Sequence, residues 1–400
     1  MFMKILIVIP ALGNVYGGPS KVVLELAESI GKLGISVDVV ATNANGEINL
    51  DVNLNEWITQ NHYRVRYFSY LNSLDYKFTW SMSQWLFANV SNYNLVHTHA
   101  VFSYPVLVTY WMCQLRKIPY IATPHGMLEP WALANKNWKK KLYFTFLEKP
   151  ALQKASSIQM LASTEAEGIK NLDLKPPVVI VPNGIHREDF ASLPDPEIFY
   201  HQFPETKNKR LIIFLGRIDP KKGLDLLAPA FAQAYQKFPD THLIIAGPDN
   251  TGFLPTAESY FIKAGCHHAV TFTGMLTGDI KYAALAAATI YVAPSYSEGF
   301  SMSVLEGMAA ALPCVITTGC NFPEAGEAEA AIIVNIDVGS IAKAIIQLLE
   351  DDQKAKNMGD SYGALRYRAR QFILDNYTWD QVALKMISVY EKIIQGNKHL

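Results

Sequence analysis

The chain alternates between short, dense hydrophobic runs and longer stretches in which hydrophobic and polar residues mix. The runs at 5–9, 35–42, 210–216 and 290–293 each end at, or lie within a few residues of, glycine or proline. Hydrophobic runs of this length, closed by turn residues, are typical of strands that are buried on both faces of a parallel sheet. The stretches 21–33 and 224–238 read as helices, so the pattern predicts an α/β fold with parallel sheets.

The pattern occurs twice, once in each half of the chain. Pro182-Asn183-Gly184 is a turn signal, and the polar segment 186–208, with prolines at 194, 196 and 204, has the composition of a linker. A length of 400 residues is enough for two domains, each with its own core. We therefore place a domain boundary here. Further strands are expected at 95–99, 118–123, 156–161, 178–181, 243–247, 270–274 and 313–317, and further helices at 340–350 and 379–395.

The stretch 290–311 carries the strongest chemical signal. Its strand leads through a loop into a Met- and Ala-rich helix, and Ser303 stands three residues before Glu306, the pattern of a capping box. Free amides at the start of a helix attract an anion. Because Glu298 and Glu306 stand beside that anion site, we expect them to bind sugar or ribose hydroxyls. The alternative is that Glu306 only caps the helix and Glu298 is a solvated turn residue.

A basic loop follows the first strand of the second half. Arg217 and Lys222 suit a diphosphate, because Arg offers a fork of donors and Lys a mobile point charge. A solvated basic turn is the alternative, but the loop's position between a strand and a helix favours a ligand. No Asp-x-Asp triplet occurs in the chain. We therefore expect these cations, rather than a metal ion, to neutralise a leaving diphosphate.

The first half offers a glycine loop and three histidines at predicted strand ends. Gly17 and Gly18 do not fit the Gly-x-Gly-x-x-Gly spacing, and no acidic residue closely follows the second strand, which argues against a dehydrogenase. Histidines where parallel strands end lie where such sheets bind ligands. We favour a structural role for His97 and His99 and a ligand role for His125.

Composition narrows the class of protein. A net charge of −1 gives no reason to expect nucleic acid, and the four cysteines show no Cys-x-x-Cys spacing, so a reducing cytoplasm is the simpler setting. The N-terminal run lacks a cleavage site and reads as a strand, and no transmembrane helix is expected. The segment Trp131–Pro150 interleaves aromatic residues with lysines, so it could lie on an anionic membrane or simply cover a core.

Together these motifs resemble the retaining glycosyltransferases of family GT4. The likeness rests on five ordered elements: the Gly17-Gly18 loop, His125-Gly126, Pro182-Asn183-Gly184, Arg217 with Lys222, and Glu298 with Glu306 seven residues apart. It departs from the family where His125-Gly126 lacks an intervening Pro. The resemblance implies a GT-B fold with two Rossmann-like domains, 1–184 and 185–374, facing across a cleft, and a C-terminal helix, about 375–400, that crosses back to the first.

The resemblance also implies roles for individual residues. His125, Glu298, Arg217 and Lys222 would be catalytic, with His125 at the reacting face and the two cations on the donor's pyrophosphate. Donor or acceptor contacts would come from Gly17, Gly18, Gly247, Met275, Leu276, Gly299, Phe300, Ser301, Met302, Ser303, Leu305 and Glu306. Core packing is the competing explanation for Met275 and Leu276.

The expected activity is transfer of a hexose from a UDP-sugar, with UDP-glucose as first candidate, to a sugar or lipid-linked hydroxyl acceptor with retention. The resemblance suggests polysaccharide or glycolipid assembly, and no cofactor or metal is expected. Three alternatives stay open: a nucleotide-sugar epimerase or hydrolase on the same fold, a retaining glycosidase with two carboxylates about 5 Å apart, and a binding protein without catalysis.

Overall fold

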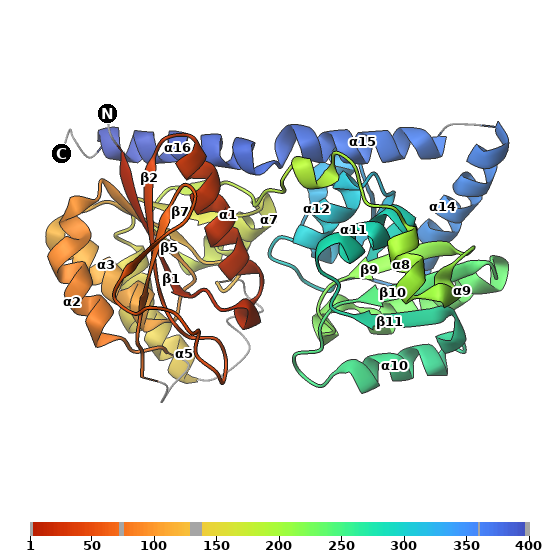
Figure 1. Ribbon diagram of the computed structural model, residues 1–400, viewed down its shortest axis with the longest axis horizontal. Coiled ribbons are helices and arrows are strands. Elements are labelled where there is room, and N and C mark those ends of the chain that lie inside the picture. The colour runs from red at the N-terminus through yellow and green to blue at the C-terminus, as the bar shows by residue number, and fades with distance from the viewer. Residues whose placement is uncertain (1–2, 72–75, 129–137, 359–360, 397–400) are drawn as a thin grey trace. The chain divides into compact units, whose positions relative to one another are not determined.

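The computed structural model describes residues 3–71, 76–128, 138–358 and 361–396, and its contacts divide the chain into two compact units (Figure 1). Unit 1 comprises Met1–Asn183 and Trp379–Leu400, and unit 2 comprises Gly184–Thr378. The division at 183 lies one residue from the predicted boundary at 184, and the return to unit 1 begins at 379 rather than at about 375.

Unit 1 is built on a sheet with strand order β3-β4-β2-β1-β5-β6-β7-β8, in which β3 pairs antiparallel with β4 and the other pairs are parallel. The predicted strand-helix-strand start is confirmed as β1, α1 and β2. The strands are β1 Lys4–Ala11, β2 Ser36–Thr42, β3 Trp57–Thr59, β4 Arg64–Phe68, β5 Leu95–His99, β6 Tyr120–Thr123, β7 Ser157–Met160 and β8 Val178–Ile180. The helices are α1 Gly18–Lys32, α2 Trp80–Asn89, α3 Tyr104–Arg116, α5 Trp138–Tyr143, the π-helix Phe144–Glu148, α6 Lys149–Leu152, α7 Ser163–Gly168 and α16 Trp379–Gly396.

Alternate side chains of β1 explain why its sequence is hydrophobic at successive positions. Ile5 and Ile7 pack in a cluster with residues of α1 and α16, whereas Leu6 and Val8 pack in a cluster with residues of α2, α3 and α6. Successive side chains of a strand point to opposite faces, so a strand covered by helices on both sides needs hydrophobic residues throughout. The helices therefore cover both faces of the central part of the sheet.

Unit 2 repeats this design on a parallel sheet of strand order β11-β10-β9-β12-β13-β14. Ile213 of β9 packs in a cluster with residues of α11, α12 and α15, and Ile212 packs in a cluster with residues of α9 and α14. The strands are β9 Arg210–Leu215, β10 Thr241–Ala246, β11 Val270–Gly274, β12 Ala288–Ala293, β13 Cys314–Thr317 and β14 Ile332–Val334. The helices are α8 Glu197–Gln202, α9 Leu224–Lys237, α10 Leu254–Lys263, α11 Gly278–Ala287, α12 Met302–Ala309, α13 Pro323–Glu327, α14 Val338–Met358 and α15 Ser361–Asn376.

The segment 186–208 is not the linker that its prolines suggest. Phe190 and Phe199 are 2% and 0% exposed and belong to the core of unit 2. The segment also contains α8, and the ring of Phe203, directly after this helix, packs against that of Phe199 with their centroids 5.0 Å apart. Two large side chains buried this deeply provide more stabilisation than a solvated linker could, so the segment is part of the unit's folded body.

A series of hydrogen bonds, in which each donor and acceptor can be assigned, connects helix α16 to the strands of unit 1. The Gln159 amide donates to the carbonyl of Val181 at 2.8 Å, so its oxygen accepts from the Thr123 hydroxyl at 2.8 Å. Thr123 must then accept from Nε2 of His97 at 2.7 Å, which leaves Nδ1 of His97 to accept from the hydroxyl of Tyr390 in α16, also at 2.7 Å. His97 is 0% exposed and fully hydrogen-bonded. These contacts support the structural role predicted for it.

Replacing Tyr390 with Phe is expected to lower the stability of unit 1 by about 1–3 kcal/mol. The change removes one hydroxyl and leaves the buried Nδ1 acceptor of His97 without a partner. The measurement is chemical unfolding together with hydrogen exchange of the α16 amides. Tyr367→Phe is the control, because Tyr367 is 69% exposed on α15 and should tolerate the change. Equal free energies of unfolding for the two variants and the parent protein would show that the His97–Tyr390 hydrogen bond does not stabilise unit 1.

Candidate functional site

The predicted donor-binding residues of unit 2 lie at the carboxyl edge of its sheet, where β9 and β12 are neighbours. The loop after β9 and the loop after β12 contact each other directly, because the amide of Tyr296 donates to the carbonyl of Lys221 at 2.8 Å. The Tyr296 hydroxyl also donates to Asp225 at 2.7 Å at the start of α9. Parallel sheets bind ligands at this edge.

Glycines allow the loops at this edge to approach closely. Gly223 has φ +70°, and a Cβ placed on it would lie 2.0 Å from the carbonyl oxygen of Pro294. A Cβ on Gly247 would lie 1.8 Å from the carbonyl oxygen of Gly216, and one on Gly319 would lie 2.3 Å from that of Ser295. No side chain fits at these distances, so glycine is required at all three positions.

Replacing Gly223 with Ala is expected to destabilise unit 2 by more than the same change at Gly252. Both residues have nearly the same positive φ, +70° and +71°, so both substitutions strain the backbone by roughly 1 kcal/mol. Only Gly223 adds a collision with a backbone carbonyl, since nothing lies within 4 Å of a Cβ on Gly252. Thermal unfolding of the two variants measures the difference. Equal losses would show that the loops are not in contact.

Lys222 and Glu298 form an ion pair that joins the two loops. Nζ of Lys222 lies 2.5 Å from Oε1 of Glu298, and each side chain is 14% exposed. The same carboxylate oxygen accepts from the Ser295 hydroxyl at 2.7 Å, while Oε2 has no hydrogen-bond partner among the residues that the structure describes. Glu298 is therefore not the solvated turn residue of the alternative. One of its oxygens is available to a hydroxyl donor.

Glu306 forms a second pair of the same kind, which the sequence does not indicate. Its Oε1 lies 2.9 Å from Nζ of Lys281 in α11, and the side chains are 17% and 16% exposed. The predicted capping box is wrong. Helix α12 begins at Met302 with Ser301 at its N-cap position, and the Ser303 hydroxyl accepts from Tyr291 at 2.8 Å instead of capping the helix.

The start of α12 has no side-chain cap, so the amides of its first turn stay available to an anion. Arg217 is exposed and has no ion-pair or hydrogen-bond partner among the described residues. Phe300 instead packs in the core of its own unit, with its ring stacked 6.0 Å from that of Tyr377, and Leu305 is 0% exposed. The predicted ligand contact of Leu305 can therefore come only from its backbone, whereas the ring of Phe300 is partly buried and keeps some exposed surface.

The other predicted donor contacts of unit 2 fall into two groups. Gly247, Gly299, Ser301, Met302 and Ser303 lie in loops or at a helix start at the carboxyl edge. Met275 is 66% exposed after β11, whereas Leu276 is 8% exposed and belongs to the core. The packing explanation therefore holds for the side chain of Leu276. A base contact through the side chain remains possible only for Met275.

The predicted site residues of unit 1 follow β1 and β6. Gly17 is the N-cap residue of α1 with φ +73°, and both Gly17 and Gly18 face open space. His125 is partly exposed, has φ +53°, and its Nε2 lies 2.9 Å from Nδ1 of His99. Burial lowers the pKa of His125 to about 4, so its imidazole is neutral at pH 7.

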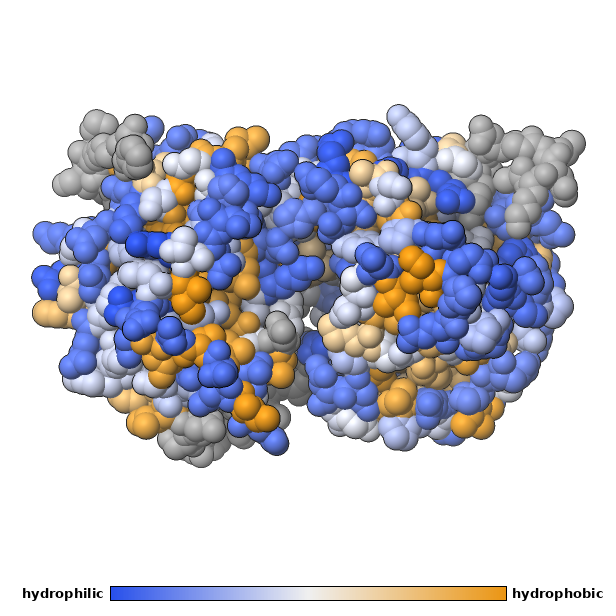
Figure 2. Space-filling model, viewed as in Figure 1, coloured by the Kyte–Doolittle hydropathy of each residue, from blue (hydrophilic) through white to orange (hydrophobic). Residues whose placement is uncertain are grey.

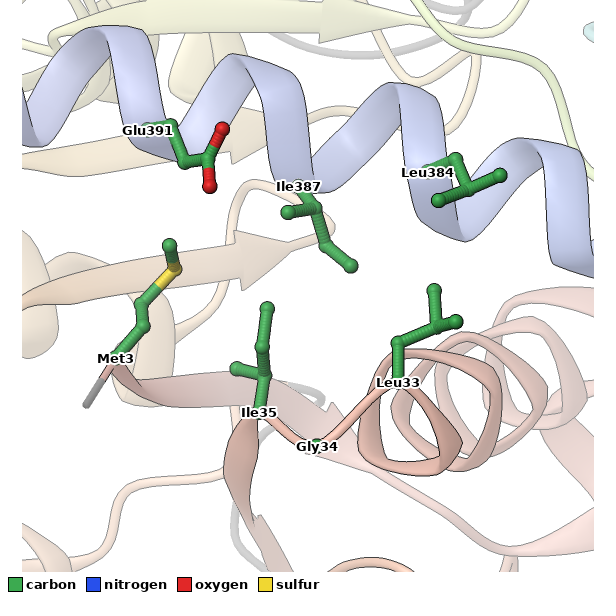
Figure 3. A pocket seen from close by; sticks show the side chains of 7 residues that line it. All are labelled: Met3, Leu33, Gly34, Ile35, Leu384, Ile387 and Glu391. Carbon is green, nitrogen blue, oxygen red and sulfur yellow. The ribbon is translucent and has the colours of Figure 1, made fainter. Parts of the chain in front are cut away.

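A pocket of about 490 Å³ lies elsewhere in unit 1, between α16 and the turn from α1 to β2 (Figure 3). Its lining is hydrophobic apart from one carboxylate, and no predicted site residue contributes to it. Among the described residues, no group of three or more His, Cys, Asp or Glu side chains could hold a metal ion. In the same part of the chain no helix is long and hydrophobic enough to cross a membrane. The pocket is lined by Met3, Leu33, Gly34, Ile35, Leu384, Ile387 and Glu391.

Comparison with known proteins places these features in a family. Residues 16–189 match the model "Glycosyltransferase Family 4", and residues 197–362 match "Glycosyl transferases group 1". Phosphatidyl-myo-inositol mannosyltransferase of Mycolicibacterium smegmatis is 30% identical over 54% of this chain and 52% of its own length. A GDP-mannose-dependent mannosyltransferase of the same organism that acts on phosphatidylinositol monomannoside is 26% identical over 50% and 52%. The chain thus spans about half the length of these curated relatives.

The fold has solved counterparts over almost its whole length. The crystal structure of Anabaena HepE in complex with UDP-glucose aligns with a TM-score of 0.75 at 15% identity, covering 98% of this chain and all of that one. At this identity the likeness shows the fold alone, and the family models supply the rest. With family matches in both halves and a largely parallel sheet in each unit, the chain belongs to the group 1 glycosyltransferases of family 4, on a GT-B fold.

Proposed function

We propose that the protein transfers a hexose from a UDP-sugar, with UDP-glucose as first candidate, to a hydroxyl acceptor with retention and without a metal ion. The observation that carries the proposal is the pair Lys222–Glu298 at the carboxyl edge of unit 2, beside the exposed Arg217 and the uncapped start of α12. Cations and helix-start amides suit a diphosphate. The solved complex of HepE with UDP-glucose supports this nucleotide sugar as the donor to test first.

Each group has a role in this proposal. Arg217, Lys222 and the α12 amides bind the diphosphate and stabilise the charge that grows on it as the glycosidic bond breaks. Glu298 accepts from sugar hydroxyls through Oε2, and Glu306 accepts from the ribose. Gly17, Gly18 and His125 contact substrate from the carboxyl edge of the unit 1 sheet. The acceptor is a sugar or a lipid-linked sugar of polysaccharide or glycolipid assembly, in line with the glycolipid acceptor named in one relative.

The decisive assay incubates the purified chain separately with UDP-glucose and GDP-mannose, with and without EDTA, and separates free nucleotide, altered sugar and new glycoside. The proposal predicts glycoside formation from UDP-glucose that EDTA leaves unchanged, with the α configuration of the donor kept in the product. Transfer from GDP-mannose alone, as the name of one relative suggests, would replace the donor. An epimerised sugar without glycoside would identify an epimerase, and nucleotide binding without turnover would identify a binding protein.

We further propose that one face of unit 1 contacts an anionic membrane. Helices α2, α3 and α5 and the π-helix expose large hydrophobic side chains, whereas the only acidic residue described in these helices and in α6, Glu148, is 0% exposed. Cations Arg116, Lys140 and Lys141 belong to the same helices. Part of the predicted segment Trp131–Pro150, residues 129–137, lies outside the described residues. The exposed side chains are Trp80, Phe87, Trp111, Leu115, Leu142, Phe146 and Leu147.

The composition of this face separates it from ordinary surface. Hydrophobic residues are exposed in several small areas of an otherwise hydrophilic surface (Figure 2), as is normal for a folded protein. Hydrophobic side chains among cations without exposed carboxylates are the combination that binds anionic lipid. Flotation with vesicles of phosphatidylcholine, with and without 30% phosphatidylglycerol, tests it. We expect binding only to the anionic vesicles, weakened about fivefold or more by Phe146→Ser and unaffected by Tyr367→Ser in unit 2.

A further inference from the structure

The turn that carries His125 holds an unfavourable backbone conformation. His125 and Gly126 have φ +53° and +73°, directly after Pro124 at the end of β6. The amide of Gly126 donates to Oε1 of Glu165 at 2.6 Å, and Oε2 of Glu165 accepts from the amide of Leu161 at 2.7 Å. A left-handed histidine costs roughly 1–2 kcal/mol, and such strain persists only where the surroundings hold it. The hydrogen bonds of Glu165 therefore hold the backbone of this turn in place.

The ring of His125 lies against that of His99. The two ring centroids are 5.1 Å apart with an interplanar angle of 26°, and Nε2 of His125 lies 2.9 Å from Nδ1 of His99. His99 is 1% exposed, and its other nitrogen, Nε2, is buried without a hydrogen-bond partner among the described residues. One of the two rings must donate across the 2.9 Å contact, and the geometry allows either direction.

The orphaned nitrogen of His99 decides the direction. Burial, and the rings of His97 and His125 beside it, hold the pKa of His99 well below its usual range, so the ring is neutral and carries one proton. If His125 donated, that proton would sit on Nε2 of His99 as a buried N–H without an acceptor. If His99 donates from Nδ1, only a lone pair is left unpaired. Orphaned buried N–H groups are the rarer and costlier case, so His99 donates.

We infer that His99 is a positioning residue that holds His125 as its Nδ1–H tautomer, with Nε2 of His125 accepting from His99. The inference rests on the proposed function for its catalytic meaning, because it makes His125 a hydrogen-bond donor to a substrate oxygen. Nδ1 of His125 has no partner among the described residues and is not among their buried, unsatisfied atoms. It is thus the nitrogen that a substrate hydroxyl or ring oxygen can reach. A neutral ring that donates polarises or orients an oxygen, and it removes no proton.

The neighbouring His97 keeps this arrangement from reversing. Its ring centroid lies 4.2 Å from that of His99. The hydrogen bonds that run from His97 through Thr123 and Gln159 to the carbonyl of Val181 place the proton of His97 on Nε2. His97 therefore offers no donor or acceptor to His99, since both of its nitrogens are already bonded. His125 is then the only described hydrogen-bond partner of the His99 ring.

Long-range proton–nitrogen correlation spectra of the full chain, labelled with ¹⁵N in histidine, test the inference without a substrate. The expected result for His125 is a protonated, pyrrole-type Nδ1 and an unprotonated, pyridine-type Nε2. Each ring is assigned by its loss from the spectrum of a variant, with His201 in unit 2 as an ordinary reference. A proton found on Nε2 of His125 in the parent protein would overturn the inference.

Two variants separate positioning from packing. His99→Gln keeps a side-chain donor, and His99→Phe keeps a ring without one. In His99→Phe we expect the Nδ1–H tautomer of His125 to lose its preference and kcat to fall about tenfold, the change expected when one neutral hydrogen bond is lost. In His99→Gln we expect the Nδ1–H tautomer to stay dominant and kcat to stay close to that of the parent protein. UDP affinity should stay the same in all three proteins, because the proposed nucleotide contacts lie in unit 2.

The outcomes distinguish this inference from the proposed function. The expected tautomer in a protein that transfers no sugar would leave the inference standing as a structural statement and remove the proposed function. Sugar transfer by the parent protein, together with an unchanged His125 tautomer in His99→Phe, would support the proposed function and overturn the inference about His99. If His99→Phe does not fold, the spectrum of the parent protein still decides, and His99→Gln supplies the kinetic comparison.

Discussion

Replacing Lys222 with Ala lowers the rate of sugar transfer about a hundredfold if Lys222 stabilises the departing diphosphate. A fixed cation aimed at growing charge contributes about 3 kcal/mol to lowering such a barrier. Lys222 is only 14% exposed and is held by Glu298, so its ammonium group is already in place before a donor arrives. The measurement is kcat and KM for the donor in the variant and the parent protein.

The change also removes the partner of a mostly buried carboxylate, which would lower the free energy of unfolding whether or not Lys222 is catalytic. Unit 2 offers a matched control in Lys281→Ala. The Lys281–Glu306 pair has a similar distance and similar exposure, but Lys281 has no proposed contact with the diphosphate. We expect comparable losses of stability in the two variants and a far smaller loss of kcat for Lys281→Ala. Equal losses of kcat would assign the effect of Lys222 to folding rather than to catalysis.

Acid is expected to destabilise unit 1 through three neighbouring histidines, His97, His99 and His125. Burial, together with neighbouring imidazoles for His97 and His99, lowers the pKa of His97 to about 3, that of His125 to about 4, and that of His99 well below its usual range. Below about pH 6.5 the unfolded chain therefore binds three protons that the folded unit does not. Their stabilisation is complete above that pH and is lost as the pH falls toward the folded values. From pH 8 to pH 5 the loss is about 2 kcal/mol for His97 and about 2 kcal/mol for His125, and His99 adds a loss of the same sign.

Two buried carboxylates oppose this trend. Burial raises the pKa of Glu148 to about 7 and also raises that of Glu165, so the folded unit gains stability from them as the pH falls below 7. Glu148 returns about 2–3 kcal/mol between pH 8 and pH 5. Glu165 adds a gain of the same sign, so the net loss of stability that we expect in unit 1 is smaller than the sum of the histidine contributions.

Hydrogen exchange, corrected for the intrinsic rate at each pH, resolves the two units. The amides of β5 should lose protection between pH 8 and pH 5 by more than those of β9, which serve as the internal reference. His97→Gln, which removes one of the three titrations, should make the loss about 2 kcal/mol smaller. Protection of β5 that does not depend on pH, or that changes equally in His97→Gln, would contradict the assignment of these pKa values.

The strands, and the loops after them that carry the candidate site, could be predicted because they depend on local sequence. The run 290–293 is hydrophobic since β12 is covered on both faces, and the following Pro294 and Gly299 mark the loop where the sheet ends. Arg217 and Lys222 could be named as candidates because they follow a strand. Features of this kind need only the neighbouring residues, so one sequence is enough to find them.

The missed features depend on residues far apart in the chain. Lys281, which pairs with Glu306, is 25 residues away in another helix, and nothing in either segment indicates the contact. The capping box failed because the Ser303 hydroxyl bonds Tyr291 of a neighbouring strand. The prolines of the segment 186–208 predict a linker, although its spaced aromatic residues, Phe190 and Phe199, indicate a buried face. Tyr390 is 293 residues from His97, so their contact was beyond sequence reasoning.

The central claim is that unit 2 holds a nucleoside diphosphate with Arg217, Lys222 and the start of α12. A crystal structure of the chain with UDP tests it most directly. We expect the β-phosphate within hydrogen-bonding distance of Lys222 Nζ, of the Arg217 guanidinium and of an amide at the start of α12, and the ribose hydroxyls on Glu306. UDP bound away from the carboxyl edge of β9 and β12, or bound there with Arg217 and Lys222 both turned away from its phosphates, would contradict it.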